Sequence, residues 1–249
     1  LYRTNILKRK SDGKLFITFN GTMNDPADII LSKTDKINVS IGDKTISGNI
    51  PKVISSAEDF TTALTDSDTT SIVLENNISV ADQIKIEKDL RIDLGGHIIS
   101  LNNSTVDTPL RIDSGNVVLS NGTIDATFAN ETVVPVCCFG GTLELNNLTV
   151  YAKTSKESCV FCGWGGIVNI ISGVYENLAK DKYFWAGGSP LVLNISNDNV
   201  GTINCFGGIF IGKDPALGDD RLGGTFVAEG YKSEKITYQG KKAFMVIKK

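Results

Sequence analysis

Four acidic residues in the middle of the chain are of the type that could carry out chemistry. They are Asp113, Asp125, Glu144 and Glu176. Glycosidic hydrolysis needs paired carboxylic acids, and lyase chemistry needs carboxylates for calcium beside an Arg or Lys base. In the sequence repeats that contain these residues, Glu144 is followed at the matching position by Asn169. Asp113 is followed in the same way by Phe139 and Trp164, so no row of carboxylates builds up. Solvated carboxylates explain this pattern equally well, and we favour a chain without enzymatic activity.

Five cysteines and a single histidine are the other candidates for metal or nucleophilic chemistry. They are Cys137, Cys138, Cys159, Cys162, Cys205 and His97. The Cys159-x-x-Cys162 spacing matches half of a zinc site, but the chain has no second such pair. We expect Cys137 and Cys162 at one position of adjacent repeats. Cys138 and Cys159 are expected to point inward as small apolar residues, together with Val134, Val136 and Phe161. His97 follows a Gly-Gly pair and is expected in a turn.

An acidic loop at residues 212–224 contains Asp214, Asp219 and Asp220. Their oxygens could hold a cation, but the spacing fits no defined calcium motif, and a surface turn is favoured. We therefore predict neither a metal nor a cofactor. The odd number of cysteines, placed inside the repeats, argues against a disulfide scaffold.

The elements that position these residues are repeats of one short pattern. It begins at Gly115, Gly141, Gly166 and Gly201, at intervals of 26, 25 and 35 residues. The second, fourth and ninth residues after each glycine are apolar or aromatic, except for a cysteine in the last copy: Val117, Leu119 and Ile124; Leu143, Leu145 and Val150; Val168, Ile170 and Tyr175; Ile203, Cys205 and Phe210. Alternation of this kind is typical of half-buried strands, and a period in this range is typical of a solenoid.

These repeats predict an all-β fold, a parallel β-helix of roughly six coils, with an antiparallel sandwich as the competing architecture. Inward residues are expected at Ile72, Leu74, Ile78, Val80, Ile84, Ile86, Leu90, Ile92, Leu94, Ile98 and Ile99. The tetrapeptide Leu-Arg-Ile-Asp at residues 90–93 returns at 110–113 and is expected to extend the coils upstream.

Two flanking regions depart from the repeat. Residues 1–50 contain two predicted hairpins, around residues 11–13 and 42–43, and form a small β-rich module for attachment or assembly. Residues 51–249 form the solenoid. Its first coil is covered by an amphipathic capping helix at about 54–65, with Ser55 and Glu58 or Ser56 and Asp59 as the capping box. Two strands at about 225–249, TFVAEGY and KAFMVIKK, end the chain, and their lysines protect an edge.

The composition excludes two classes of partner. The net charge is −3 and 21% of the residues are charged, so no basic field attracts nucleic acid. No stretch of about 18 uninterrupted apolar residues occurs, which excludes a membrane-spanning helix.

The segments SSAEDFTTAL, SIVLENNISV, LRIDLGGHII, SGNVVLSNGTI and GGTLELNNLTV resemble right-handed parallel β-helices of the pectate-lyase-like superfamily. They are particularly similar to gut bacterial surface proteins and to phage virion proteins such as head fibres and tail spikes. The resemblance covers about residues 52–249 and implies fold more firmly than function. It implies a structural or adhesive fibre or decoration protein of a phage virion, assembled in the bacterial cytoplasm as a homotrimer and attached through residues 1–50. The alternatives are a polysaccharide lyase or glycoside hydrolase, and a bacterial adhesin at the cell surface or secreted.

Aromatic residues provide the candidate contact site. Phe139 and Trp164 are expected to share an outward position in adjacent coils, and Tyr183, Phe184 and Trp185 follow in the loop at 177–190. An exposed apolar strip usually marks a contact surface. Three uses remain open: packing between the subunits of a homotrimer, coverage by the 177–190 loop, and stacking against a host glycan.

Overall fold

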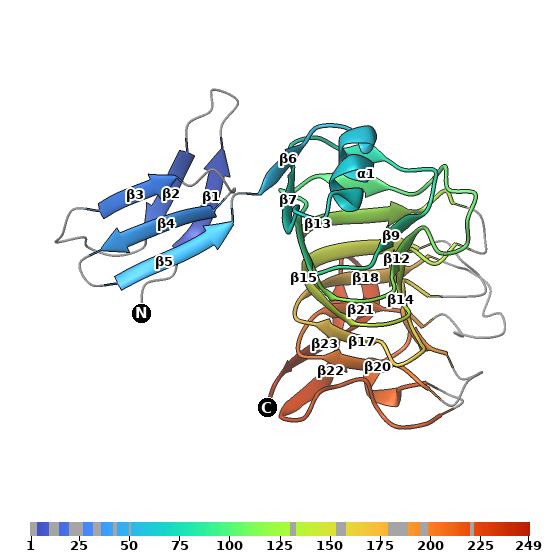
Figure 1. The fold of residues 1–249 in the computed structure, drawn as a ribbon. Coiled ribbons are helices and arrows are strands. Elements are labelled where there is room, and N and C mark those ends of the chain that lie inside the picture. The colour runs from blue at the N-terminus through green and yellow to red at the C-terminus, as the bar shows by residue number, and fades with distance from the viewer. Residues whose placement is uncertain are drawn as a thin grey trace.

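The computed structural model describes residues 51–129, 133–152, 158–178, 189–194, 199–219 and 222–249 in full. For residues 1–50 it describes the backbone of five strands. The described protein is mostly β, with parallel sheets, one short α-helix and a 3-10 turn, η1 (Pro215–Leu217) (Figure 1). This arrangement is consistent with the predicted parallel β-helix, and its parallel pairing excludes the antiparallel sandwich.

The N-terminal strands pair in antiparallel fashion. Strand β1 (Thr4–Arg9) pairs with β2 (Leu15–Phe19). Strand β4 (Lys36–Ile41) lies between β3 (Ala27–Leu31) and β5 (Lys44–Asn49). Both predicted hairpins are therefore confirmed. The role of residues 1–50 in attachment stays a prediction.

A sheet of 13 strands, here the large sheet, forms one side of the stack. Its parallel strands are β6 (Lys52–Ile54), β7 (Ser71–Leu74), β8 (Ile78–Ser79), β10 (Leu90–Asp93), β11 (Ile98–Ser100), β13 (Asn116–Ala126), β15 (Thr142–Ala152), β17 (Ile167–Ile170), β18 (Gly173–Asn177), β20 (Thr202–Cys205) and β21 (Ile209–Ile211). Strand β13 pairs with β10 in its first half and with β11 in its second, because the chain bends between these two shorter strands. Strand β15 pairs in the same way with β17 and β18.

A sheet of five strands, here the small sheet, carries the candidate contact site. Its order is β19-β16-β14-β12-β9, and all neighbours are parallel. The strands are β9 (Ile84–Ile86), β12 (Leu110–Ile112), β14 (Val136–Cys138), β16 (Val160–Cys162) and β19 (Leu191–Leu193).

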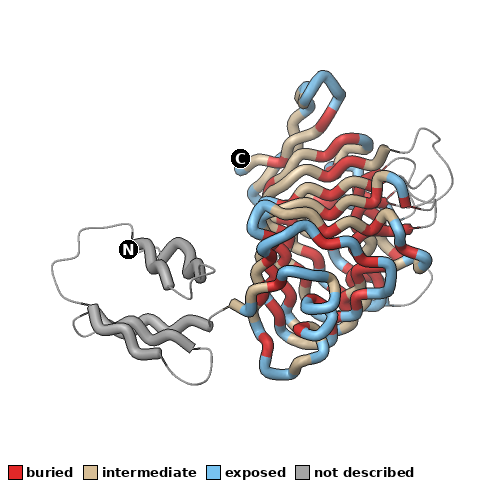
Figure 2. Tube along the Cα trace, turned by 90° about the horizontal axis from the view of Figure 1, so that it is seen from above, coloured by how far each residue is buried: buried red, intermediate tan, exposed pale blue. Residues whose placement is uncertain are grey.

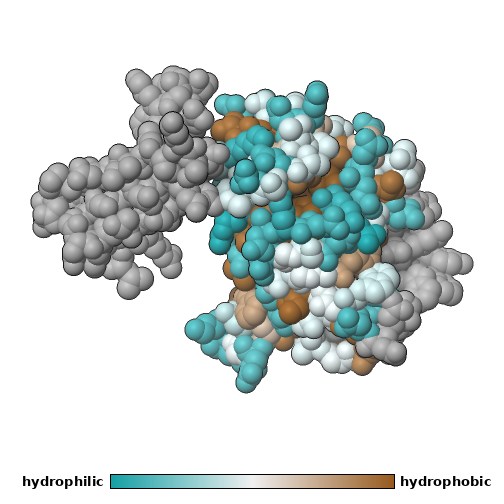
Figure 3. All heavy atoms as spheres, viewed as in Figure 1, coloured by the Kyte–Doolittle hydropathy of each residue, from teal (hydrophilic) through white to brown (hydrophobic). Residues whose placement is uncertain are grey.

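The register of the large sheet follows the sequence repeat. Val117 lies opposite Leu143, Leu143 opposite Val168, and Val168 opposite Ile203. The fourth and ninth positions stack in the same way, ending in Cys205 and Phe210. These residues are buried, and buried residues alternate with half-buried ones along the stacked strands (Figure 2). On the face drawn in Figure 3, hydrophilic side chains cover much of the described surface.

The upstream coils differ from the expectation in two details. All expected inward residues there are buried except Ile98, which is half-buried because its neighbour Ile99 occupies the inward position. The two Leu-Arg-Ile-Asp tetrapeptides, at residues 90–93 and 110–113, do not lie opposite each other in neighbouring coils. Leu90 lies opposite Val117 in the large sheet, whereas Leu110 lies opposite Ile84 in the small sheet. The two tetrapeptides resemble each other because both are short strands with the same alternation.

The bends of β13 and β15 depend on residues that tolerate a left-handed backbone. Asn121 has a φ of 57° and Asn147 a φ of 52°. Asn147 Nδ2 donates to Asn121 Oδ1 at 3.1 Å, so the two side chains form a ladder along the bend. In the next coil, Gly173 has a φ of 126°, and a Cβ there would lie 2.0 Å from the carbonyl oxygen of Leu148. Only glycine fits this position.

Helix α1 (Ala57–Thr65) contacts β6 and β9 at the N-terminal end of the stack. Ser56 is its N-cap, and the Ser56 hydroxyl accepts a hydrogen bond from the Asp59 amide at 3.1 Å, which is one of the two hydrogen bonds of the predicted capping box of Ser56 and Asp59. The helix begins later than predicted, because Ile54 belongs to β6. Phe60 and Ala63 are its buried residues. No helix in the described part of the chain is long and apolar enough to span a membrane.

A hairpin of β22 (Tyr231–Tyr238) and β23 (Lys241–Lys248) ends the chain, and β23 pairs with β21. The predicted strand TFVAEGY is wrong: Gly230 lies in a turn with a φ of 79°, and the strand begins after it. Of the lysines expected at an edge, Lys241, Lys242 and Lys248 lie on β23 outside the two residues that pair with β21, and they pair with β22 alone.

Candidate contact surface

Three aromatic rings meet on the outer face of the small sheet. Phe139 follows β14, Phe161 is the central residue of β16, and Trp164 lies in the turn after β16. The ring centroids of Phe139 and Trp164 are 4.5 Å apart in an edge-to-face arrangement. Those of Phe139 and Phe161 are 5.5 Å apart, and those of Phe161 and Trp164 are 6.1 Å apart. These separations are within the range in which aromatic rings attract each other.

The strands position these rings through their register. The central residues of the small sheet form a single outward row: Lys85, Arg111, Cys137, Phe161 and Val192. Trp164 is placed differently, by a turn in which it has a φ of 46° and the Gly166 amide donates to the Gly163 carbonyl at 2.9 Å. This turn leaves Trp164 44% exposed, whereas Phe139 and Phe161 are half-buried.

A planar cation extends the aromatic surface toward the N-terminal end of the stack. The guanidinium carbon of Arg111 lies 4.3 Å from the centroid of the Phe139 ring. Arginine favours such stacking because its charge is delocalised over a flat group. We call Arg111, Phe139, Phe161 and Trp164 the aromatic patch.

Arg111 is held in place by Asp113, which also binds a lysine. Arg111 Nε lies 2.5 Å from Asp113 Oδ1, and Lys85 Nζ lies 3.2 Å from Asp113 Oδ2. Partial burial raises the pKa of Asp113, but the hydrogen bonds from Arg111 and Lys85 outweigh it and hold this pKa below its usual value. Lys85 also lies 2.7 Å from Glu87, and hydrogen bonds to Glu87 and Asp113 raise the pKa of Lys85. Asp113 is therefore ionised near neutral pH and is not suited to donate a proton.

The remaining sequence candidates have structural partners or stand apart from the patch. Asp125 accepts a hydrogen bond from the Thr127 amide, and buried Glu176 pairs with Lys241. Asp214 caps η1, and Asp219 accepts from the Leu193 amide at 3.2 Å. Glu144 lies beside Asn169, as predicted. Asp220 lies outside the described residues.

The positions of the cysteines and the histidine in the structure agree only in part with the positions predicted from the sequence. All five cysteines are buried, and none of them forms a disulfide. Cys138 lies opposite Cys162 on adjacent strands, so the expected match of Cys137 with Cys162 is wrong by one residue. Cys137 instead lies opposite Phe161, which makes the inward assignment of Phe161 wrong as well. His97 lies in the turn of residues 94–97, and its amide donates to the Leu94 carbonyl at 2.7 Å.

Among the residues described in full, no group of three or more His, Cys, Asp or Glu side chains is placed to hold a metal ion. Within the cysteine pair, the hydrogen bond with Cys138, followed by burial, raises the pKa of Cys162. Both thiols lie inside the stack, where Cys162 Sγ also donates to the Gly166 carbonyl at 3.1 Å. These residues therefore act as small core side chains.

The structure brings together two of the five predicted contact residues, Phe139 and Trp164. Their expected positions need one adjustment: Gly163, rather than Trp164, follows Phe139 in the stack, because the Gly163 amide donates to the Cys138 carbonyl. Tyr183, Phe184 and Trp185 lie outside the described residues. Phe161 and Arg111 were missed. The alternation of Val160 and Cys162 around Phe161 is the signal that would have placed this ring outward.

Residues 52–164, just under half of the chain, match the family model described as a pectate lyase-like adhesive domain. The matched segment contains the whole aromatic patch. The fold is also similar to a solved structure of SRRP from L. reuteri 53608, with 19% sequence identity, coverage of 62% of this chain and 55% of that chain, and a TM-score of 0.41. The chain thus aligns with little more than half the length of that structure. A search of curated proteins gave no match. The expected virion origin has no support from these comparisons. The family match associates residues 52–164 with pectate lyase-like adhesive domains.

Proposed function

We propose that this chain is a non-enzymatic adhesive domain of a bacterial surface protein and that it binds its target through the aromatic patch. The observation that carries the proposal is the overlap of the adhesive-domain match, residues 52–164, with the patch at Arg111, Phe139, Phe161 and Trp164. The match supplies the class of function, and the patch supplies a surface suited to it.

We also infer that the two sheets close into a right-handed parallel β-helix. The registers support this inference, because every coil between Asn116 and Ile170 returns to the same position after 25 or 26 residues. The handedness follows from the resemblance to pectate-lyase-like proteins and from the strong preference of parallel crossovers for the right hand. Such a stack holds neighbouring side chains at fixed spacing of about 4.8 Å and presents a rigid surface.

The chemistry of the patch favours a glycan or another ligand with flat apolar faces and polar edges. Trp164 offers an exposed ring, and exposed aromatic rings combine a large apolar area with few rotatable bonds. Arg111 is oriented by Asp113 beside the rings, so it adds hydrogen-bond donors at low cost in side-chain entropy. A contact of this kind needs no bond cleavage.

A catalytic role for Asp113 has less support. Its carboxylate is paired with two cations, Arg111 and Lys85, and Lys85 is shared with Glu87. The polysaccharide lyase or hydrolase alternative would require Asp113 or Glu144 to take part in bond cleavage.

We further propose that the chain forms a homotrimer and that residues 1–50 attach it, alongside its adhesive function.

Binding to an array of immobilised neutral and acidic glycans tests the proposal. We expect Trp164→Ala and Phe139→Ala each to weaken binding about tenfold or more, since central aromatic residues dominate contact surfaces. Phe128→Ala is the matched control, because Phe128 is 76% exposed and belongs to another loop. It should bind as the wild type does.

Sedimentation equilibrium of the same proteins distinguishes the other use of the patch. If Trp164→Ala dissociates a trimer into monomers without any effect on glycan binding, the patch is a subunit interface and the adhesive assignment fails. Equal loss of binding in Phe128→Ala would also contradict the proposal, because the loss would then not depend on the patch.

A further inference from the structure

The outermost strands of the two sheets have different surroundings. At the N-terminal end of the large sheet, β6 is the outermost strand and pairs with β7. At the C-terminal end, the β22-β23 hairpin pairs with β21, and Asp219 accepts a hydrogen bond from the Leu193 amide of β19. Strand β9, at the N-terminal end of the small sheet, pairs with β12 alone. Native proteins usually cover such edges, because an open edge can pair with another chain.

The hydrogen bonds of β9 show which backbone groups are left open. The Ile84 amide donates to the Pro109 carbonyl at 2.6 Å, and the Ile86 carbonyl accepts from the Asp113 amide at 2.9 Å. In a strand of a parallel sheet, the amide and the carbonyl of one residue point to the same side. Those of the next residue point to the other side. The Lys85 amide and carbonyl therefore face away from β12, and neither has a hydrogen-bond partner among the described residues.

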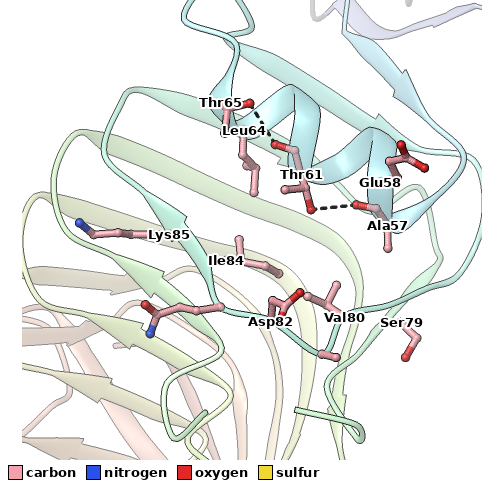
Figure 4. Close-up of a pocket in the computed structure, with 12 residues that line it drawn as sticks. Ala57, Glu58, Thr61, Leu64, Thr65, Ser79, Val80, Asp82, Ile84 and Lys85 are labelled. Carbon is pink, nitrogen blue, oxygen red and sulfur yellow. Dashed lines mark hydrogen bonds between the residues drawn. The ribbon is translucent and has the colours of Figure 1, made fainter. Parts of the chain in front are cut away.

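A pocket of about 490 Å³ lies along this open edge, between helix α1 and the chain from Ser79 to Lys85 (Figure 4). Helix α1 forms one wall with Ala57, Thr61 and Leu64, and Val80 and Ile84 lie on the opposite side. The Thr61 hydroxyl donates to the Ala57 carbonyl at 3.0 Å, so it is engaged within the helix. The pocket thus has apolar side chains on both walls, beside the edge of β9 that faces away from β12.

The charges around the pocket define what could enter it. Glu58 and Asp82 line the pocket, are exposed, and form no ion pair within the fully described part of the chain. Lys85, the one basic residue of the lining, is already paired with Glu87 and Asp113. The pocket therefore has uncompensated negative charge next to free backbone donors and acceptors.

We propose that the open edge of β9 binds an extended basic peptide segment of a partner protein by β-strand addition. The peptide backbone pairs with the Lys85 amide and carbonyl, its small apolar side chains contact Leu64 and Ile84, and its lysine or arginine side chains reach Glu58 and Asp82. Main-chain pairing gives affinity in this mode of recognition, and side-chain pockets give selectivity. This site borders the aromatic patch, because Lys85 pairs with Asp113, the residue that also binds Arg111. The proposal does not depend on the function of the patch.

The test uses the full chain and a blocked hexapeptide of alternating lysine and valine. Two matched peptides serve as controls, one with glutamate in place of lysine and one with N-methylated alternate amides. We expect the lysine peptide to bind at least tenfold more tightly than either control. Amide hydrogen exchange measured by NMR should show new protection of the Lys85 amide, while the already paired Ile84 and Ile86 amides change little.

Two variants separate backbone pairing from charge. Lys85→Pro removes the free amide without touching the β12 hydrogen bonds, and Lys85→Ala, its control, loses the same side chain but keeps the amide. Lys85→Pro should bind the peptide about fivefold more weakly than Lys85→Ala. Equal binding of the lysine and glutamate peptides, no binding, or an unprotected Lys85 amide in the complex would each overturn the proposal. Sedimentation showing a dimer dissociated by the lysine peptide would do so too, since a second copy would then be the occupant.

Discussion

Asp113 shows how a carboxylate of catalytic type can serve to orient a contact surface. It binds Arg111 and Lys85 on two neighbouring strands, and Arg111 in turn lies over Phe139. The pKa of Asp113 is lowered by these partners, so the charge that holds Arg111 persists into acid. At the residue scale, the patch thus depends on an ion pair that has no need of proton transfer.

Asp113→Asn should reveal how much the ion pairs of Asp113 stabilise the fold at each pH. Because the folded-state pKa is below the ordinary value of 3.8, the ionised carboxylate stabilises the fold above that pH and loses its contribution as pH falls through the lower folded-state value. We expect the wild type to melt at a higher temperature than Asp113→Asn at pH 7 and the difference to shrink between pH 5 and pH 2, as followed by circular dichroism. Asp82→Asn, which removes an exposed carboxylate without an ion pair, is the control. A difference that is constant with pH would contradict the assigned ion pairs.

At the scale of elements, stability comes from the inward rows of the stacked strands. Ile170 on β17 is fully buried, with Leu145 and Cys205 as its partners on either side. Each strand alone is too short to bury its apolar face, so neighbouring coils stabilise one another. A defect in a central row should therefore affect the stack as a whole.

Ile170→Asp is expected to destabilise the fold by about 4 kcal/mol or more, because an unpaired charge would replace a buried side chain. Urea denaturation followed by circular dichroism measures this change. Asn169→Asp is the control: its side chain points outward and can still accept the hydrogen bond from Asn204. Wild-type-like unfolding of Ile170→Asp would contradict the inward assignment.

The capping helix is attached to the first coils by a lysine from the stack. Lys88 Nζ donates to the carbonyls of Ala63 and Asp66 at the C-terminal end of α1. Burial is the main cause that lowers the pKa of Lys88. Carbonyls at this end of a helix have no partners within the helix, and a cation there stabilises it.

Lys88→Met should lower the free energy of unfolding by about 1–2 kcal/mol, since it keeps the side-chain stem but removes the hydrogen bonds to both carbonyls. Chemical denaturation provides the value. Lys85→Met removes a lysine whose ion pairs are more exposed and should destabilise the fold less than Lys88→Met does. A larger loss in Lys85→Met than in Lys88→Met would contradict this view of the cap.

At the scale of the whole molecule, the sequence predicts those features that repeat. The apolar second, fourth and ninth positions after Gly115, Gly141, Gly166 and Gly201 determine both the strands and their register, because stacked coils demand the same residue types at the same places. The capping helix was predictable for a similar reason: its 3.6-residue period contrasts with the alternation around it.

The parts that were not predicted lack this periodic signal. The small sheet has strands of only three residues, which are too short to fix the register of neighbouring strands from the sequence. The predicted register differs by one residue from the observed one, and this places Phe161 on the wrong face of the sheet. The ion pair between Lys85 on β9 and Asp113 after β12 joins two strands, which sequence spacing alone does not reveal. The strand at Tyr231–Tyr238 was missed because its residues are largely polar, as an edge strand allows.

The central claim is that the chain adheres to its target without cleaving it. The most direct measurement records binding and product release together, with the purified chain on each glycan of the array and mass spectrometry of the supernatant. The account predicts retention that depends on Trp164 and no released oligosaccharide. Release of product by the wild type, lost in Asp113→Ala or Glu144→Ala, would contradict it and identify the chain as an enzyme.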